Sequence, residues 1–213
     1  MLVGHYSAAF AAKAMAPRVP LWTLFLAVQF VDILWALFIL VGIENARLDP
    51  SLASNALDLY DMPYTHSLLA TVLWAAVAGG LGWALFRKRG EGWVIALAVT
   101  ACVVSHWVLD YLVHRPDLIV FENDPRFKVG LGLWDWPLLA LALELVLFVG
   151  SVLWLWLTLP QARSRALAIF AGVLTVAQIG IGFGPHPTSV SIIAAIALAT
   201  FLGLTYAAFR LDK

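Results

Sequence analysis

The sequence predicts an all-α integral membrane protein, and its composition and its spacing of apolar segments both indicate this class. Hydrophobic residues make up 62% of the 213-residue chain, charged residues only 12%, and the mean hydropathy is +0.90. A soluble domain has about 25% charged residues, so the chain falls outside the soluble class. Apolar segments at or near the length of roughly 20 residues that spans a bilayer occur six times. We therefore expect one helical domain over residues 1–213.

The expected helices follow one another along the chain. Residues 1–16 form a short Ala-rich helix that Pro17 and Pro20 end, and this helix packs into the bundle. Each membrane span is bounded by charged residues, proline or glycine. The spans are expected at about 20–43, 64–86, 92–114, 134–159, 166–184 and 188–209.

The glycines inside the second span indicate close helix packing. Gly79, Gly80 and Gly82 lie within an apolar run and follow no strand, so a phosphate-binding loop is not expected there. The single cysteine, Cys102, forms no intrachain disulfide and excludes a zinc site built from several cysteines. It is expected to be a small buried side chain.

Basic residues at the span ends predict how the chain lies in the membrane. Lysine and arginine near cytoplasmic ends of spans follow the positive-inside rule. The residues that fall on one side are Lys13, Arg18, Arg87, Lys88, Arg89, Arg163, Arg165, Arg210 and Lys213. We expect a multi-pass protein of the cell (inner) membrane with both termini in the cytoplasm and an acidic external loop at 44–63. The 115–133 loop carries mixed charge and supports this orientation less strongly.

The net charge of zero argues against a nucleic-acid partner, because the chain has no excess of basic residues. Membrane lipid is the expected neighbour.

One stretch near the end of the third span points to a functional site. His106, Asp110 and His114 are four residues apart and share one face of a helix, with about 6 Å between neighbours. Ionisable groups inside a membrane span are costly and usually mark a working site. Histidine and carboxylate at this spacing are ligands for a divalent metal such as zinc. The stretch predicts a metal site within the bundle.

Helix rise places further ionisable residues at a similar depth. At 1.5 Å per residue, these side chains lie roughly 18–30 Å above the cytoplasmic ends of their segments. The short N-terminal helix folds back at its prolines, which lifts its histidine to the same layer. Five segments thus contribute to one layer in the outer half of the membrane: His5, Asp32, His66, His106 with Asp110, and Glu144.

Structural explanations compete with metal binding at several of these positions. His106 and Asp110 could form an ordinary helical hydrogen bond, and His66 could be an interfacial histidine. His114 could lie at the interface beside Arg115. The acidic residues of the following loop are expected to be solvated surface: Asp117, Glu122, Asp124 and Asp135.

Several short motifs occur together in a fixed order. They are Gly4-His5 with Ala12-Lys13, Asp32, Thr65-His66-Ser67, His106-Trp107-Val108-Leu109-Asp110, His114-Arg115-Pro116-Asp117-Leu118, and Gly130-Leu131-Gly132-Leu133-Trp134 followed by Glu144. In this order they resemble the YdjM-like membrane-bound metal-dependent hydrolases over about residues 4–144. The last two spans carry no motif of that family. The family is distantly similar to the zinc-dependent phospholipase C and single-strand nuclease superfamily, helical phosphoesterases with a multi-zinc cluster.

The resemblance implies a set of ligands. Asp32, His66, His106 and Asp110 would hold one zinc ion, and Asp110 would bridge toward a second ion near His5. His114 and Glu144 are candidates for that second ion or for orienting its ligands. The superfamily also uses a His-x-x-x-Glu pair for a further ion, but here Ala140 precedes Glu144, so that ion is in doubt. One or two ions are expected, with zinc first and manganese or iron as other candidates.

The expected activity is a metal-dependent hydrolysis of a phosphoester, with a lipid-like or other small molecule as substrate. The metal would supply an activated water, and Asp110 or Glu144 would take its proton. Arg115, Arg126 and Lys128 would neutralise the phosphate.

Two non-catalytic functions remain as alternatives. The metal could be structural or could be transported, but transport needs a polar path to the cytoplasm, and the spans offer little there beyond Lys13, Gln29 and Gln178. A partner-binding scaffold would leave the buried carboxylates unexplained.

Overall fold

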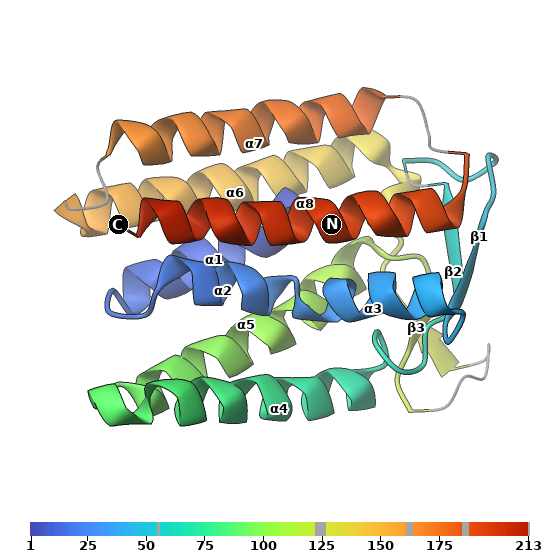
Figure 1. Cartoon of the computed structure of the whole chain (residues 1–213). Helices are drawn as coiled ribbons and strands as arrows, with labels where there is room; N and C mark the ends of the chain where they lie inside the picture. The colour runs from blue at the N-terminus through green and yellow to red at the C-terminus, as the bar shows by residue number, and fades with distance from the viewer. Residues whose placement is uncertain (55, 122–126, 161–163, 185–187, 213) are drawn as a thin grey trace.

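The structure, a computed structural model, describes residues 1–54, 56–121, 127–160, 164–184 and 188–212. Helices dominate these residues, as expected for an all-α membrane protein (Figure 1). The α-helices are α1 (Val3–Met15), α2 (Leu21–Val28), α3 (Phe30–Val41), α4 (Leu68–Phe86), α5 (Gly92–Val113), α6 (Pro137–Thr158), α7 (Arg165–Phe183) and α8 (Val190–Leu211).

Small strand pairs and short 3-10 turns complete the described chain. The antiparallel pair β1 (Asn45–Leu48) and β2 (Leu57–Asp61) and the antiparallel pair β3 (Leu118–Ile119) and β4 (Lys128–Val129) lie at one end of the bundle, which we call the hairpin end (Figure 1). The 3-10 turns are η1 (Arg87–Arg89) and η3 (Leu133–Asp135). These strands were not predicted from the sequence.

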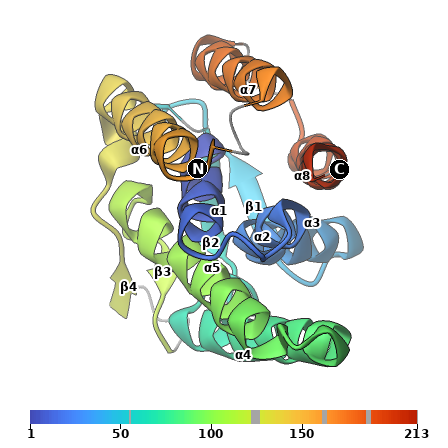
Figure 2. The ribbon, with the colours of Figure 1, turned by 90° about the vertical axis from the view of Figure 1, so that its left-hand side faces the viewer.

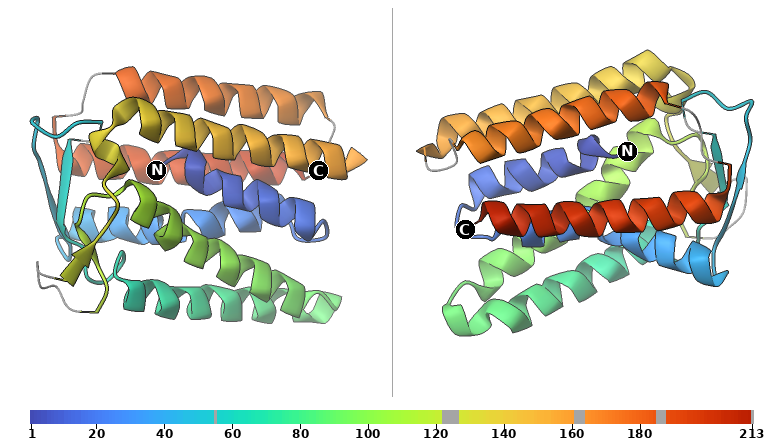
Figure 3. Two further views of the ribbon diagram at one scale, coloured as in Figure 1. Left: turned by 180° about the vertical axis from the view of Figure 1, so that it is seen from behind. Right: turned by 45° about the horizontal axis from the view of Figure 1, so that its top comes forward.

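The candidate membrane spans are consistent with the predicted set of six. Five helices, α4 to α8, are long and apolar enough to cross a bilayer, and α2 with α3, a pair bent by 50° at Gln29, is a sixth candidate if the pair forms one span. The turns between α1 and α2 and between α4 and α5 lie at the end away from the hairpins, as do the end of α6, the start of α7 and the end of α8 (Figures 1 and 3). Arg163 and Lys213 lie outside the described residues. Which end faces the cytoplasm stays a prediction.

The bend at Gln29 has a local cause. In an unbroken helix the carbonyl of Val28 would accept a hydrogen bond from the N–H of Asp32. Here Val28 O is 2.7 Å from Nδ1 of His106. A side chain that inserts into the backbone ladder is a common origin of such kinks. The bend therefore links α2 and α3 to the ionisable face of α5.

The short helix α1 lies inside the bundle between α2, α5 and α6, as Figure 2 shows. Below the level of His5 it packs through aromatic side chains. Phe10 meets Phe25 and Phe148 edge to face, with ring centroids 5.4 and 5.7 Å apart, and Tyr6 stacks on Phe25 at 4.5 Å. These four side chains are fully buried and define what we call the aromatic plug.

Candidate metal centre

Three helices and one loop bring the predicted ligands together near the hairpin end. His5 lies in the first turn of α1 and Asp32 in the first turn of α3, while His66 directly precedes the N-cap of α4. His106 and Asp110 come from α5, and His114 is the C-cap residue of that helix. All four histidines and Asp110 are buried, and Asp32 is mostly buried. The structure thus gathers the six residues predicted as metal ligands.

Asp110 is the centre of this group. Its Oδ1 lies 3.1 Å from Nε2 of His5 and 3.6 Å from Nε2 of His114. Its Oδ2 lies 3.1 Å from Nε2 of His106 and 3.8 Å from Nε2 of His66. Each carboxylate oxygen therefore faces its own pair of imidazoles, which is the arrangement of a bridging carboxylate.

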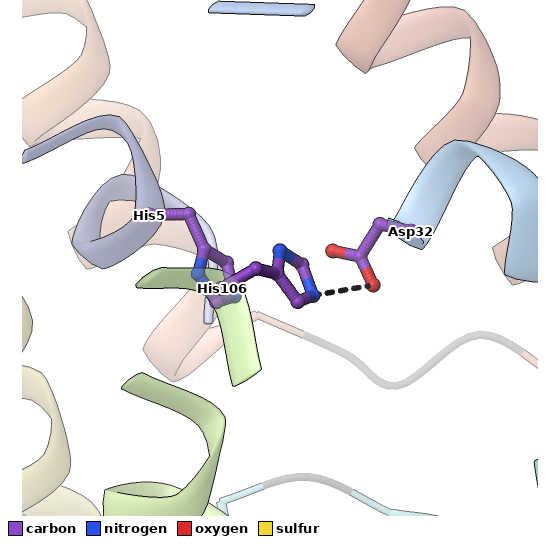
Figure 4. A group of neighbouring side chains, drawn as sticks. All are labelled: His5, Asp32 and His106. Carbon is purple, nitrogen blue, oxygen red and sulfur yellow. Dashed lines mark ion pairs between the residues drawn. The ribbon is translucent and has the colours of Figure 1, made fainter. Parts of the chain in front are cut away.

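Asp32 closes the other side of the group. Its Oδ1 lies 3.2 Å from Nε2 of His66 and 3.6 Å from Nε2 of His106. His5 stacks on His106 with ring centroids 3.8 Å apart and an interplanar angle of 7°. Figure 4 shows the ring of His106 between His5 and Asp32, with a nitrogen directed at the carboxylate. Two parallel rings this close repel one another strongly if both are charged, so at least one is neutral.

Hydrogen bonds on the side of the His106 and His114 rings that faces away from Asp110 determine which ring nitrogen carries hydrogen. Nδ1 of His106 lies 2.7 Å from Val28 O, and a carbonyl oxygen can only accept. Nδ1 of His114 lies 2.8 Å from Oδ1 of Asp117, and a carboxylate also only accepts. Both rings therefore donate through Nδ1, which leaves the lone pair of a neutral ring on Nε2.

His66 is oriented by a longer chain of contacts through the loop before α4. Thr65 Oγ1 donates to Oε2 of Glu44 at 2.6 Å, so at its other contact, 2.8 Å from Nδ1 of His66, it accepts. Glu44 also accepts from the N–H groups of Thr65 and Tyr64 at 2.9 and 2.8 Å. Burial raises the pKa of Glu44, and the hydrogen bond from Thr65 opposes that rise. This chain directs Nε2 of His66 to the carboxylates.

The residues of the Thr65-His66-Ser67 motif thus have separate tasks. Thr65 orients the ring, and His66 faces Asp32. Ser67 is the N-cap of α4 and accepts from the N–H of Ala70 at 3.0 Å. The carbonyl of His66 also accepts from Nε1 of Trp107 at 3.1 Å, which ties the motif to α5.

The atoms that face one another inside this group, which we call the inner atoms, fit a metal ion. They are ring nitrogens of the histidines and carboxylate oxygens of Asp32 and Asp110. A lone pair on Nε2 and a carboxylate oxygen are both acceptors, so a positive charge is needed between them, either an added proton or a metal ion. Several inner atoms are buried without a hydrogen-bond partner among the described residues, namely both ring nitrogens of His5, Nε2 of His106 and Oδ1 of Asp110.

The spacing of the inner atoms also fits. Atoms that each lie about 2.0–2.1 Å from one tetrahedral zinc ion are about 3.3 Å apart. Two overlapping groups have ligand atoms that all lie within 4.8 Å of one another: His5, Asp32 and His106, and His66, His106 and Asp110. The two groups overlap at His106, whose Nε2 could bind one ion only, because its Nδ1 donates to Val28 O.

Glu144 lies beside this group and supports α1. Its Oε2 accepts from the N–H groups of Leu2 and Gly4 at 2.9 and 3.2 Å. These are free donors at the N-terminus of the helix that carries His5. The amino group of Met1, which the sequence-based ligand set does not include, lies 3.7 Å from Oδ1 of Asp110. Glu144 therefore fixes the position of His5 whatever its further role.

The basic residues predicted to neutralise a phosphate have protein partners. Nε of Arg115 donates to Asp135 at 2.7 Å and its NH2 group to Ala53 O at 2.7 Å. Lys128 donates to Tyr60 O. Arg126 lies outside the described residues, as do Glu122 and Asp124.

Two of the acidic residues that were expected to be solvated lie in the described part of the chain, and they differ in side-chain exposure. Asp135 is more than half exposed, as expected. Asp117 is mostly buried and bonds His114, so the expectation of a solvated side chain is wrong for it. The sequence offered one signal for this contact, since residue 117 lies three positions after the histidine.

A small cavity reaches the ligands from the hairpin end. It has a volume of about 130 Å³ and its walls include Asp32, His66, Asp110, His114 and Trp134. The ring of Trp134 lies over His114 with centroids 4.2 Å apart. The candidate ligands are therefore enclosed but not sealed.

No family model, curated protein or solved structure matches this chain.

Proposed function

We propose that this protein is a membrane-embedded metal-dependent hydrolase that acts on a phosphoester of a lipid-like substrate. One observation carries the proposal: Nε2 of His106, which holds the lone pair of a neutral ring, lies 3.1 Å from Oδ2 of the buried Asp110, and Nε2 of His5 lies 3.1 Å from its Oδ1. Two hydrogen-bond acceptors at this distance need a positive charge between them, either a proton or a metal ion. Two buried carboxylates without a compensating charge would also destabilise the fold.

The ligands divide into two sets around Asp110. His66, His106 and Asp32 with Oδ2 of Asp110 form the first set. His5 and His114 with Oδ1 of Asp110 form the second. Nitrogen and carboxylate donors of this kind favour zinc, with manganese or iron as alternatives, and the two sets correspond to one or two ions.

The bound metal would supply a water of lowered pKa and a Lewis acid for a phosphoryl oxygen. Asp110 has imidazoles at both oxygens, so it is better suited to hold the centre together than to accept a proton. Glu144 lines a larger cavity beside Met1 and is the stronger candidate for the general base. Arg115 would meet a phosphate only after leaving Asp135.

Metal transport, the main alternative, is disfavoured by the aromatic plug. Tyr6, Phe10, Phe25 and Phe148 close the described bundle on the side of the centre away from the hairpins. Gln29 is buried at the bend, and on the far side of it the buried hydroxyls of Thr23 and Ser151 donate to the nearby carbonyls of Pro20 and Phe148. A purely structural metal remains the competing function.

The resemblance to the YdjM-like hydrolases supports the proposal on sequence motifs alone. We further propose that the protein belongs to that family, that zinc is its metal, and that it lies in the inner membrane with the hairpin end outside and the C-terminus in the cytoplasm. These assignments are proposals. The expectation that both termini lie in the cytoplasm is not kept for the N-terminus, because the Met1 amino group is buried 3.7 Å from Oδ1 of Asp110.

The decisive experiment is metal analysis of the purified protein in detergent. We expect one or two divalent ions per chain in the wild type and in the control Ser105→Ala, whose hydroxyl bonds only Cys102 O of the same helix. His106→Ala and Asp110→Ala should lose the metal. Metal-loaded protein should then release phosphate or a head group from phospholipid in mixed micelles, and the ligand variants should not.

Two outcomes would decide against hydrolysis. Absence of metal in the wild type, with thermal unfolding unchanged by a chelator, would make the centre a buried hydrogen-bond network. Bound metal without turnover of any phosphoester would favour the structural role.

A further inference from the structure

A second and larger cavity adjoins the candidate metal centre. It has a volume of about 610 Å³ and lies between α6, α7 and α8 next to the β1–β2 hairpin. We call it the groove. Its walls are mainly apolar residues, among them Leu141 of α6, Ile181 and Gly182 of α7, and Ala197 and Phe201 of α8. This volume is within the range of about 300–1,000 Å³ that small-molecule sites occupy.

The groove and the metal cavity share part of their walls. Met1, Leu57, Trp134 and Phe201 line both. Glu144, which bonds the N-terminus of α1, also lines the groove. A molecule in the groove would therefore have one end beside the metal ligands.

The groove is open on the membrane side of the bundle. Leu138, Ile181 and Ile196 line it, yet they are 70%, 61% and 56% exposed. In the end-on view of Figure 2, α7 stands away from α8. A lipid could therefore enter sideways between these two spans without crossing the water phase.

The length of the groove is close to the depth of one leaflet. On α8 its wall residues run from Ile193 to Phe201, eight residues or about 12 Å along the helix. Half of the hydrocarbon core of a bilayer is about 15 Å. The groove thus covers most of the hydrocarbon depth of one leaflet, and the candidate metal centre lies toward the head-group end.

The groove also contains a polar group that lacks a partner. Gln178 of α7 lines it and is buried, and its Oε1 has no hydrogen-bond partner within the described part of the chain. This oxygen would accept a hydrogen bond from a hydroxyl or an amide in the linker region of a lipid. A wall for hydrocarbon alone would not need an amide at this depth.

We infer that the groove is the binding site for the hydrocarbon chain of the substrate, and that the substrate is a lipid phosphoester from the leaflet at the hairpin end. This inference rests on the proposed hydrolase function for the head group, but the groove itself can be tested separately. Lipid tails are as apolar as the groove walls, so the groove gains little affinity from the hydrophobic effect and selects by shape. It also gives α7 and α8 a function.

The test introduces a larger side chain at the groove wall on α7 and, separately, at the groove wall on α8. Gly180 lines the groove, and a Cβ there would meet no heavy atom within 4 Å, so Gly180→Leu adds volume at the wall without a clash, and Ala197→Leu adds volume at the wall on α8. Gly172→Leu is the matched control, because Gly172 lies on the same helix, also has open space at its Cβ and does not line the groove. Ala199→Leu is the control on α8.

The readout is crosslinking of a glycerophospholipid with a diazirine near the end of one acyl chain, in phosphatidylglycerol vesicles, mapped by mass spectrometry. We expect wild type and controls to be labelled near Ala197 and Phe201, and both groove variants to lose at least four-fifths of this labelling. Labelling at Val173 and Val176, which are exposed on α7, should not change. Metal content should be equal in all five proteins.

Each outcome separates the two proposals. Groove labelling that Gly180→Leu and Ala197→Leu leave unchanged, or labelling spread evenly over exposed positions, overturns the lipid groove and does not affect the hydrolase. Selective groove labelling in a protein that binds no metal supports the groove and overturns the hydrolase.

Discussion

His106 Nε2 lies 3.1 Å from Oδ2 of Asp110, while the opposite nitrogen of the same ring bonds Val28 O. The pair is four residues apart on α5, so helix geometry places the two side chains on one face. The bond to Val28 leaves a neutral ring with its lone pair directed at a carboxylate. A hydrogen bond within the pair then requires a charged ring, whereas a shared metal ion does not.

Substitution of the two carboxylates of the centre, Asp110 and Asp32, should change the metal content to different extents. Asp110→Asn places an amide opposite imidazoles on both sides, so both ions should be lost. Asp32→Asn affects only the side with His66 and His106, and one ion should remain near His5 and His114. Metal analysis of the two variants checks this prediction. Equal metal content in both variants would contradict the division of ligands around Asp110.

Glu44 and Thr65 should matter for the metal although neither is a ligand. Thr65→Val removes the hydroxyl that orients His66, and Glu44→Gln weakens the acceptor of that hydroxyl. Loss of a group that orients a metal ligand typically lowers affinity by roughly 10–100-fold. Titration with zinc in competition with a chelator would measure the change.

The control for this prediction is Asp58→Asn on the same hairpin. Asp58 pairs with Arg47, whose side chain is 70% exposed, and surface pairs contribute little. We expect wild-type zinc affinity in this variant. If Thr65→Val also binds zinc like the wild type, then the contact with Nδ1 of His66 has no part in positioning the ring.

Glu144 should separate stability from catalysis. Glu144→Leu leaves two N–H groups at the start of α1 without their acceptor, at a cost of about 1–3 kcal/mol for each buried group. Glu144→Gln keeps an acceptor oxygen but cannot take a proton as a carboxylate does. We expect Glu144→Gln to unfold at a temperature near that of the wild type and Glu144→Leu to have a lower unfolding midpoint. Both variants should lose hydrolysis. Full activity of Glu144→Gln would exclude Glu144 as the base.

The grouping of the candidate ligands could be predicted from the sequence because helix rise is nearly constant and an apolar span limits where a helix can lie. His5, Asp32, His66 and Asp110 come from different segments, yet counting residues from the span ends put them in one layer, and the structure brings them into contact. The spans themselves agree to within a few residues at most ends.

The remaining features depend on contacts that no local pattern encodes. The bend at Gln29 involves a ring from another helix, and the role of Glu44 depends on how the hairpin folds back to Thr65. The groove depends on the spacing of α7 from α8, which carry no recognised motif. An isolated acidic residue in a loop, such as Glu44 or Asp117, looks the same in sequence whether it is solvated or buried.

The glycines of α4 provide a test of the packing that supports the centre. A Cβ on Gly79 would overlap Thr100 Oγ1 of α5 and lie 3.2 Å from Ala96 O, whereas a Cβ on Gly80 would have open space. The expectation that glycines allow close helix approach here agrees with Gly79 and Gly82 facing α5, but not with Gly80. Adding a side chain at the interface would force the helices apart because packed cores do not absorb extra volume.

We therefore expect Gly79→Leu to destabilise the protein by about 1–3 kcal/mol or more, and Gly80→Leu to leave it close to the wild type. Thermal unfolding in detergent, followed by helix signal, compares the two variants at matched helix propensity. Because α5 carries His106 and Asp110, the separation should also weaken zinc binding in Gly79→Leu alone. Equal unfolding midpoints would mean that α4 and α5 are not in close contact at Gly79, and the position of His66 relative to Asp110 would then lose its structural support.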